Sequence, residues 1–234
     1  STTVSSAKNK LHRSYFTLAP SVSKWKQSRR FYPVMKAFLP LLVIAFAFST
    51  QAAERPPNVV LLFADDLGYG DIAAFGNPIV QTPNLDRMAA EGVTLTQHYS
   101  ASPICAPARA ALLTGRYNHR TGAVDVPSNR GLDRISLAET TVADLFKSAG
   151  YATGMVGKWH NGVHDMRYHP NARGFDEFAG FLNGGMDYWQ WVLDYNGKPK
   201  PADGRYLTDV FSDEAVEFVE RHHKEPFLLY LAYN

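Results

Sequence analysis

Two short apolar runs limit the folds available to this chain more than any other feature of its sequence. Residues 58–64 (NVVLLFA) and 227–232 (FLLYLA) contain no charged side chain and consist mainly of aliphatic and aromatic residues. Runs of this length predict strands, and the lack of polar alternation predicts that the first strand is buried on both faces and the second is also buried. Such strands are typical of parallel sheets that helices cover on both sides.

Helix signals alternate with the strand signals along the chain. Thr82 and Pro83 predict the start of a helix that ends near Gly92, and Ser136 with Glu139 predicts a capping box for a helix ending at residue 149. Further helices are predicted at residues 106–113 and 208–223, further strands at 93–100 and 151–156, and an irregular segment at 183–204. This alternation predicts an α/β fold with a mixed, largely parallel sheet sandwiched between helices.

Charge is distributed very unevenly along the sequence. Residues 1–53 hold eight of the 24 Lys and Arg residues and none of the 22 Asp and Glu residues, so the rest of the chain has a net charge of about −6. An acidic body without clustered Lys or Arg argues against nucleic-acid binding. Hydrophobic residues make up 45% of the chain, which argues against a disordered protein.

The start of the chain has the pattern of a signal peptide. Residues 37–48 (AFLPLLVIAFAF) follow Lys36 and precede a short stretch of small and polar residues. The run is shorter than the roughly 20 residues that a membrane-spanning helix needs, so we expect no stable membrane insertion. We expect residues 1–53 to be a leader, with translation starting at Met35, and the protein to be secreted or periplasmic.

Two adjacent carboxylates follow the first apolar run. Asp65 and Asp66 come directly after residues 58–64, and open α/β sheets place their ligands at the carboxyl ends of such strands. Adjacent carboxylates repel each other unless a cation neutralises them, and oxygen ligands of this kind suit Ca²⁺ or Mg²⁺. Taken alone, the pair is more simply explained as a turn with solvated aspartates.

The chain has one cysteine, which excludes an intrachain disulfide and a cysteine-based zinc cluster. Cys105 lies at the start of a predicted helix, where backbone N–H groups attract anions, and Arg109 follows one turn later. The simplest alternative is a small buried hydrophobic side chain. A tyrosine-phosphatase loop is excluded, because the position where it needs an arginine is Ala111.

These segments resemble the signatures of a known family. Residues 105–109 (CAPAR) with 112–116 (LLTGR) resemble the first signature of the type I sulfatases, and residues 150–160 (GYATGMVGKWH) resemble the second. Residues 58–70 (NVVLLFADDLGYG) are similar to the metal-binding strand of the same family, and the resemblance extends over residues 57–234. Two separate multi-residue signatures in the right order are highly specific.

The resemblance implies the alkaline-phosphatase-like sulfatase fold. Residues 187–189 (DYW) and 196–199 (NGKP) are most similar to the arylsulfatase B and N-acetylgalactosamine-sulfatase branch. Residues 54–234 then correspond to the N-terminal part of a catalytic domain. In the family, a histidine, an Asp-Asn pair and a second lysine lie beyond the position of Asn234, so we expect a truncated domain that is inactive alone.

The resemblance also implies a mechanism, in which a maturating enzyme oxidises Cys105 to formylglycine. The hydrated aldehyde has two hydroxyls on one carbon, so one can attack sulfur and the other lets the sulfate ester collapse and leave. Asp65, Asp66 and the modified Cys105 would bind Ca²⁺, with Mg²⁺ as the alternative ion. Arg109 would hold the formylglycine.

Two further side chains of the second signature gain roles by the same resemblance. Lys158 would bind the sulfate group, and His160 would accept a proton from the formylglycine hydrate. The expected substrate is an aryl or carbohydrate sulfate. Tyr188, Trp189 and Trp191 either stack on sugar rings or pack within the protein.

Two other functions remain open on the sequence alone. A phosphonate or phosphodiester hydrolase of the same superfamily also uses a formylglycine-type nucleophile. A non-catalytic protein that binds sulfated glycans is a second alternative, but such a protein has no need for the cysteine.

Overall fold

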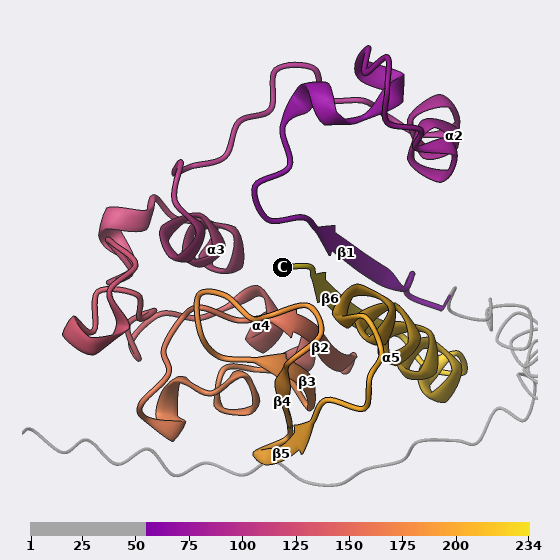
Figure 1. Cartoon of the computed structure of the whole chain (residues 1–234). Coiled ribbons are helices and arrows are strands. Elements are labelled where there is room, and N and C mark those ends of the chain that lie inside the picture. The colour runs from indigo at the N-terminus through magenta and orange to yellow at the C-terminus, as the bar shows by residue number, and fades with distance from the viewer. Residues whose placement is uncertain (1–54) are drawn as a thin grey trace, which may run out of the picture. The chain divides into compact units, whose positions relative to one another are not determined.

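The computed structural model describes residues 55–234 and contains a sheet with the strand order β1-β6-β2-β3-β4-β5 (Figure 1). The predicted leader lies outside the described residues. Strands β1, β6, β2 and β3 are parallel, whereas β4 and β5 form an antiparallel extension, which confirms the mixed, largely parallel sheet. The strands span Val59–Phe63 (β1), Ala152–Lys158 (β2), Glu177–Phe181 (β3), Val192–Tyr195 (β4), Lys198–Pro201 (β5) and Phe227–Ala232 (β6).

Four α-helices connect or flank these strands within the described residues: Pro83–Glu91 (α2), Cys105–Thr114 (α3), Val142–Ser148 (α4) and Leu207–His222 (α5). Helix α2 begins after Thr82 and ends before Gly92, as the sequence predicts. Helix α3 ends at Gly115, which has the left-handed conformation expected of a C-terminal glycine. No helix in residues 55–234 is long and apolar enough to cross a membrane.

The central strand β6 shows how the two layers of helices are held on the sheet. Phe227, Leu229 and Leu231 pack into a cluster with residues of α5, and Leu228 and Tyr230 pack into a second cluster with residues of α3 and α4. Figure 1 shows α5 on one side of the strands and α3 and α4 on the other. The continuous apolar run at 227–232 is therefore a strand buried on both faces, as the sequence predicts.

The same prediction is wrong for β1. Val60 and Leu62 are 47% and 46% exposed, while Val59, Leu61 and Phe63 point into the core. Strand β1 lies at the edge of the described sheet, and α5 packs over its neighbours rather than over β1 itself. One face of β1 is consequently open within residues 55–234.

Two other local predictions are also wrong. Residues 93–100 form no strand, because they find no neighbouring strand and side chains such as Val93 and Tyr99 are largely exposed. Helix α4 begins at Val142 rather than after Ser136, since the reciprocal capping bonds form between Thr141 and Asp144. Its end near Gly150 is as predicted.

Part of the segment predicted to be irregular, residues 183–204, is a β-hairpin. Strands β4 and β5 are joined by Asn196 and Gly197, whose φ angles are 53° and 84°. Two consecutive residues with positive φ match the tight type I′ hairpin turn, for which Asn-Gly is the preferred sequence. Strand β3 was likewise not predicted from the sequence.

The centre of the sheet depends on a glycine in β2. Gly157 has a φ of +109°, and a Cβ placed there would lie 1.9 Å from the carbonyl oxygen of Ala232 in β6. We expect Gly157→Ala to lower the free energy of unfolding by roughly 2–4 kcal/mol, measured by urea denaturation. Gly70→Ala is the matched control, because no described atom comes within 4 Å of that Cβ. Equal stabilities of the two variants would contradict this account.

Candidate active site

The candidate site lies where three neighbouring parallel strands end. Asp65 and Asp66 follow β1, Lys158 is the last residue of β2, and Tyr233 follows β6. These strands are adjacent in the order β1-β6-β2, so their carboxyl ends meet at one edge of the sheet. Open α/β sheets place their ligands at this edge.

Asp65 is the centre of a buried ion-pair network. Its Oδ2 accepts a hydrogen bond from Nζ of Lys158, and its Oδ1 lies 3.2 Å from Nη2 of Arg109. Both cationic side chains are almost completely buried, and the side chain of Asp65 is 11% exposed. The structure thus brings together three of the predicted site residues, which come from β1, β2 and α3.

Arg109 is held by more than its ion pair. Its Nη1 donates to the carbonyl oxygen of Lys158 at 2.5 Å, its Nη2 donates to that of Tyr233 at 3.2 Å, and its guanidinium lies 5.1 Å from the ring centroid of Phe63. A planar guanidinium has five donors in a fixed geometry and stacks on aromatic rings, so a lysine could not replace it here. Arg109 therefore ties α3 to the ends of β1, β2 and β6.

Electrostatics keeps the Asp65 carboxylate ionised. Burial alone would raise its pKa, but the hydrogen bond from Lys158 and the charge of Arg109 outweigh burial and hold the pKa below its usual value. With two cations around one carboxylate, these three side chains carry a net positive charge.

Cys105 faces a cavity that it shares with the two aspartates. The cavity has a volume of about 260 Å³, and its lining includes Asp65, Asp66, Ser102 and Cys105. The thiol is unpaired and half-buried at the first position of α3, and no side chain in residues 55–234 caps this end of the helix. The first N–H groups of α3 and the dipole of this helix are thus available to an anion.

His160 is fixed in an unusual backbone conformation two residues after Lys158. It is 5% exposed and has a φ of +50°, which is strained for a residue other than glycine. Gly184 packs so closely against the imidazole ring that a Cβ at position 184 would lie 2.6 Å from Cε1 of His160. Burial, together with the charge of Lys158, lowers the pKa of His160, so the imidazole is neutral and can accept a proton at pH 7.

No sequence pattern predicts the two buried polar residues beside this histidine. Asn161 donates from Nδ2 to the carbonyl oxygens of Ala106, at 3.0 Å, and of Asp133, at 3.3 Å. It thereby links the His160 segment to the first turn of α3. The carboxylate oxygens of Asp133 are fully buried and have no hydrogen-bond partner among the described residues. Neither residue lies in a recognisable motif, since only the folded chain brings them together.

The donor set suits a hard divalent cation but is incomplete within residues 55–234. Asp65 and Asp66 offer carboxylate oxygens beside the same cavity, which are the ligands that Ca²⁺ and Mg²⁺ prefer. The described residues contain no group of three or more His, Cys, Asp or Glu side chains arranged to hold a metal ion. Ca²⁺ takes 6–8 oxygen ligands, so this pair fits one part of such a site.

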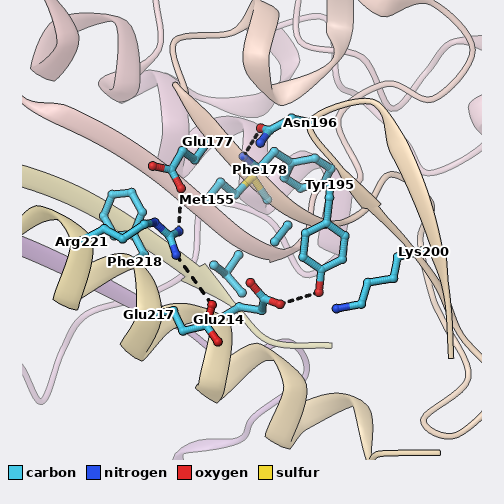
Figure 2. A pocket seen from close by; sticks show the side chains of 12 residues that line it. Met155, Glu177, Phe178, Tyr195, Asn196, Lys200, Glu214, Glu217, Phe218 and Arg221 are labelled. Atoms are coloured by element: carbon cyan, nitrogen blue, oxygen red, sulfur yellow. Dashed lines mark hydrogen bonds and ion pairs between the residues drawn. The ribbon is translucent and has the colours of Figure 1, made fainter. Parts of the chain in front are cut away.

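A larger cavity of about 350 Å³ lies elsewhere, between β3, the β4–β5 hairpin and α5 (Figure 2). None of the predicted site residues lines it. Its polar groups are already engaged: Arg221 pairs with Glu177 at 2.6 Å, Tyr195 donates to Glu214 at 2.6 Å, and Nζ of Lys200 lies 4.7 Å from the ring centroid of Tyr195. We therefore assign these charges to packing α5 against the sheet rather than to chemistry.

The fold and the site define an α/β protein with a cluster of paired charges and a cysteine at the carboxyl edge of its sheet. A family model described as Sulfatase matches residues 57–234, and the chain belongs to this family. The resemblance seen in the two signatures is thus confirmed.

Individual relatives agree with the family and with the predicted branch. N-acetylgalactosamine-6-sulfatase of Mus musculus is 38% identical over 222 residues, which cover 82% of this chain and 42% of that protein. The chain therefore spans less than half the length of the curated relatives it matches.

Solved structures confirm the sulfatase fold. The crystal structure of Ps i-CgsB in complex with k-i-k-neocarrahexaose has a TM-score of 0.72 and 38% identity, covering 77% of this chain and 45% of that one. The structure of BT4656 in complex with its substrate D-glucosamine-2-N,6-O-disulfate has a TM-score of 0.66 and 30% identity, covering 76% and 34%.

The buried Asp133 carboxylate, which has no hydrogen-bond partner within residues 55–234, makes stability depend on pH. Burial raises its pKa above the unfolded value, so the folded state holds its proton more tightly and loses stability as pH rises through the folded pKa. We expect Asp133→Asn to gain stability relative to the wild type as pH increases from about 4 to 8, measured by urea denaturation at each pH. A stability difference that is independent of pH, or that falls as pH rises, would refute this assignment.

Proposed function

We propose that the protein hydrolyses sulfate esters through a formylglycine formed from Cys105. The observation that carries this proposal is the meeting of Asp65, Arg109 and Lys158 beside a cavity lined by Cys105. These residues come from two separate sulfatase signatures and from the aspartates after β1. A protein that only binds glycans has no need for a cysteine at this position.

Formylglycine supplies the covalent chemistry. One hydroxyl of the hydrated aldehyde forms a bond to sulfur while the bond from sulfur to the alcohol oxygen breaks, and the alcohol leaves with a proton. The second hydroxyl then loses its proton, the carbon–oxygen bond to sulfate breaks and the aldehyde forms again. Cys105 lies where the N–H groups of α3 favour an anion throughout these steps.

The neighbouring side chains bind and orient the reactants. Lys158 pairs its ammonium group with Asp65, which lines the cavity, and its proposed role is to bind a sulfate oxygen. Arg109 keeps α3 and the strand ends in register and adds positive charge. His160, whose neighbour Asn161 is bonded to the first turn of α3, is the proposed acceptor of a proton from the hydrate.

Asp65 and Asp66 would hold a Ca²⁺ ion, with Mg²⁺ as the alternative. A bound divalent cation supplies Lewis-acid polarisation of the sulfate group and lowers the pKa of the attacking hydroxyl. The support is the oxygen donor set beside the cavity of Cys105. Removing the metal with a chelator is expected to abolish turnover, and added Ca²⁺ to restore it.

A sulfated carbohydrate is the proposed substrate class. Two similar solved structures hold a neocarrahexaose and a glucosamine disulfate, and the curated relatives include N-acetylgalactosamine-6-sulfatases. A maturating enzyme that reads Cys105, Pro107 and Arg109 is the second proposed partner. The signal-peptide pattern of residues 37–48 supports a secreted or periplasmic location.

The state of Cys105 tests the proposal directly. In protein purified from its native host, we expect mass spectrometry to find an aldehyde in place of the thiol in the peptide that contains Cys105. Cys105→Ser should carry no aldehyde and should stall after attack on sulfate, because a serine ester has no second hydroxyl to expel it. An unmodified thiol in protein that releases sulfate would disprove the mechanism.

Gly184 provides a test of the histidine. The Cβ of Gly184→Ala would push the His160 ring aside, which costs little stability because the ring is the far end of a side chain. We expect kcat of the full-length enzyme to fall about 10- to 100-fold, because small misplacements of catalytic groups are costly. Gly185→Ala is the matched control, since no described atom lies within 4 Å of its Cβ. Equal kcat values for the two variants would rule out this role of His160.

A further inference from the structure

Three aromatic side chains, two exposed and one half-buried, form a small cluster that the proposed mechanism does not use. The rings of Tyr188 and Tyr206 stack with centroids 5.3 Å apart and an angle of 21° between them, and Trp189 lies 5.2 Å from Tyr206 at 49°. Trp189 is 59% exposed and Tyr188 is 38% exposed. We call Tyr188, Trp189 and Tyr206 the aromatic platform.

The backbone around the aromatic platform is held firmly in place. Oδ1 of Asp187 accepts hydrogen bonds from the N–H groups of Trp189, at 2.7 Å, and Gln190, at 2.6 Å. The carbonyl oxygen of Tyr188 accepts from the N–H of Leu207 at 2.9 Å, which joins the two parts of the platform. The rings are thus largely preorganised, so a ligand would lose little free energy in ordering them.

Trp191 shows that the exposure of Trp189 is a specific feature of this segment. Trp191 is 1% exposed, packs in the core and donates from Nε1 to the carbonyl oxygen of Arg205 at 3.1 Å. Trp189, two residues earlier, leaves most of its indole in solvent. Tyrosine and tryptophan are enriched at interfaces, and contiguous exposed apolar patches mark binding surfaces.

The loop that carries Tyr188 and Trp189 contacts the candidate active site at two places. At its start, Gly184 packs against the ring of His160. Further along, the hydroxyl of Tyr188 donates to the carbonyl oxygen of Asn234 at 3.1 Å, and Nδ2 of Asn234 donates to that of Met186 at 2.9 Å. Asn234 directly follows Tyr233, whose carbonyl oxygen binds Arg109. The aromatic platform therefore lies at the rim of the site.

We propose that the aromatic platform binds a sugar ring of the substrate, with Trp189 as the main contact. This inference rests on the proposed sulfatase function. Pyranose rings present a face of C–H groups that packs on an aromatic ring, while their hydroxyls stay at the edge and in water. Tyrosine and tryptophan combine an apolar face with a polar group and suit such a ligand.

Size and position favour a sugar over a protein partner. Three rings are far smaller than the roughly 800 Å² that each partner contributes to a standard protein interface. A saccharide whose sulfate enters the cavity at Cys105 would extend across the rim, where the platform stands. None of the platform residues lines the cavity, so a small aryl sulfate bound there would not need the platform.

The difference between these two substrates gives the test. For the full-length enzyme, kcat and KM are measured with p-nitrophenyl sulfate and with a panel of sulfated oligosaccharides that includes a neocarrahexaose and an N-acetylgalactosamine 6-sulfate disaccharide. We expect Trp189→Ala to raise KM for the saccharide that is turned over by roughly 3- to 10-fold, with kcat nearly unchanged. The constants for p-nitrophenyl sulfate should stay within twofold of the wild type.

Two further variants separate stacking from a general effect. Trp189→Phe keeps an aromatic ring and should restore most of the saccharide affinity. Tyr117→Ala removes a side chain that is 69% exposed and lies outside the platform, and should leave both KM values unchanged.

Three results would overturn the inference. The first is an unchanged saccharide KM in Trp189→Ala. The second is a lower oligomer mass of this variant in light scattering with an unchanged KM, which would make the platform a protein interface. The third is a wild-type enzyme that turns over p-nitrophenyl sulfate but no saccharide of the panel. A wild type that turns over neither substrate would instead disprove the proposed function, and this inference with it.

Discussion

The candidate site depends on one carboxylate that two buried cations share. Asp65 can be buried only because Lys158 and Arg109 compensate its charge, and the cations can be buried only because Asp65 is there. The three residues come from β1, β2 and α3, so the network forms only when both strands and the helix are correctly placed. Arg109 reinforces this by binding the carbonyl oxygens at the ends of β2 and β6.

This network also explains how an acidic chain can form a local site for an anion. Beyond residue 53 the chain has a net charge of about −6, which repels sulfated ligands at a distance. Within the site, Lys158 and Arg109 balance the carboxylates of Asp65 and Asp66, and the open N-terminus of α3 adds partial positive charge beside Cys105. The position of a few buried charges, rather than the net charge, therefore sets what the site can bind.

The sequence predicted the parts of the molecule that depend on local patterns or on a family signature. It located β6, the ends of α2 and α3, and the residues around Asp65. It failed where tertiary neighbours decide: β1 has one open face because it is an edge strand, and residues 93–100 lack a partner strand. The hairpin turn at Asn196 could have been predicted, because Asn-Gly is the preferred sequence for such a turn. The buried Asp133 carboxylate, without a partner among the described residues, could not, because its burial follows only from the fold.

A double-mutant cycle on the stability of the protein tests the central network most directly. The free energy of unfolding is measured by urea denaturation, without added Ca²⁺, for Asp65→Asn, Lys158→Met and the double variant. Each single change leaves a buried charge without its partner, so we predict that the double variant loses at least about 1 kcal/mol less stability than the sum of the two. Losses that simply add would show that Asp65 and Lys158 act independently and would contradict the account.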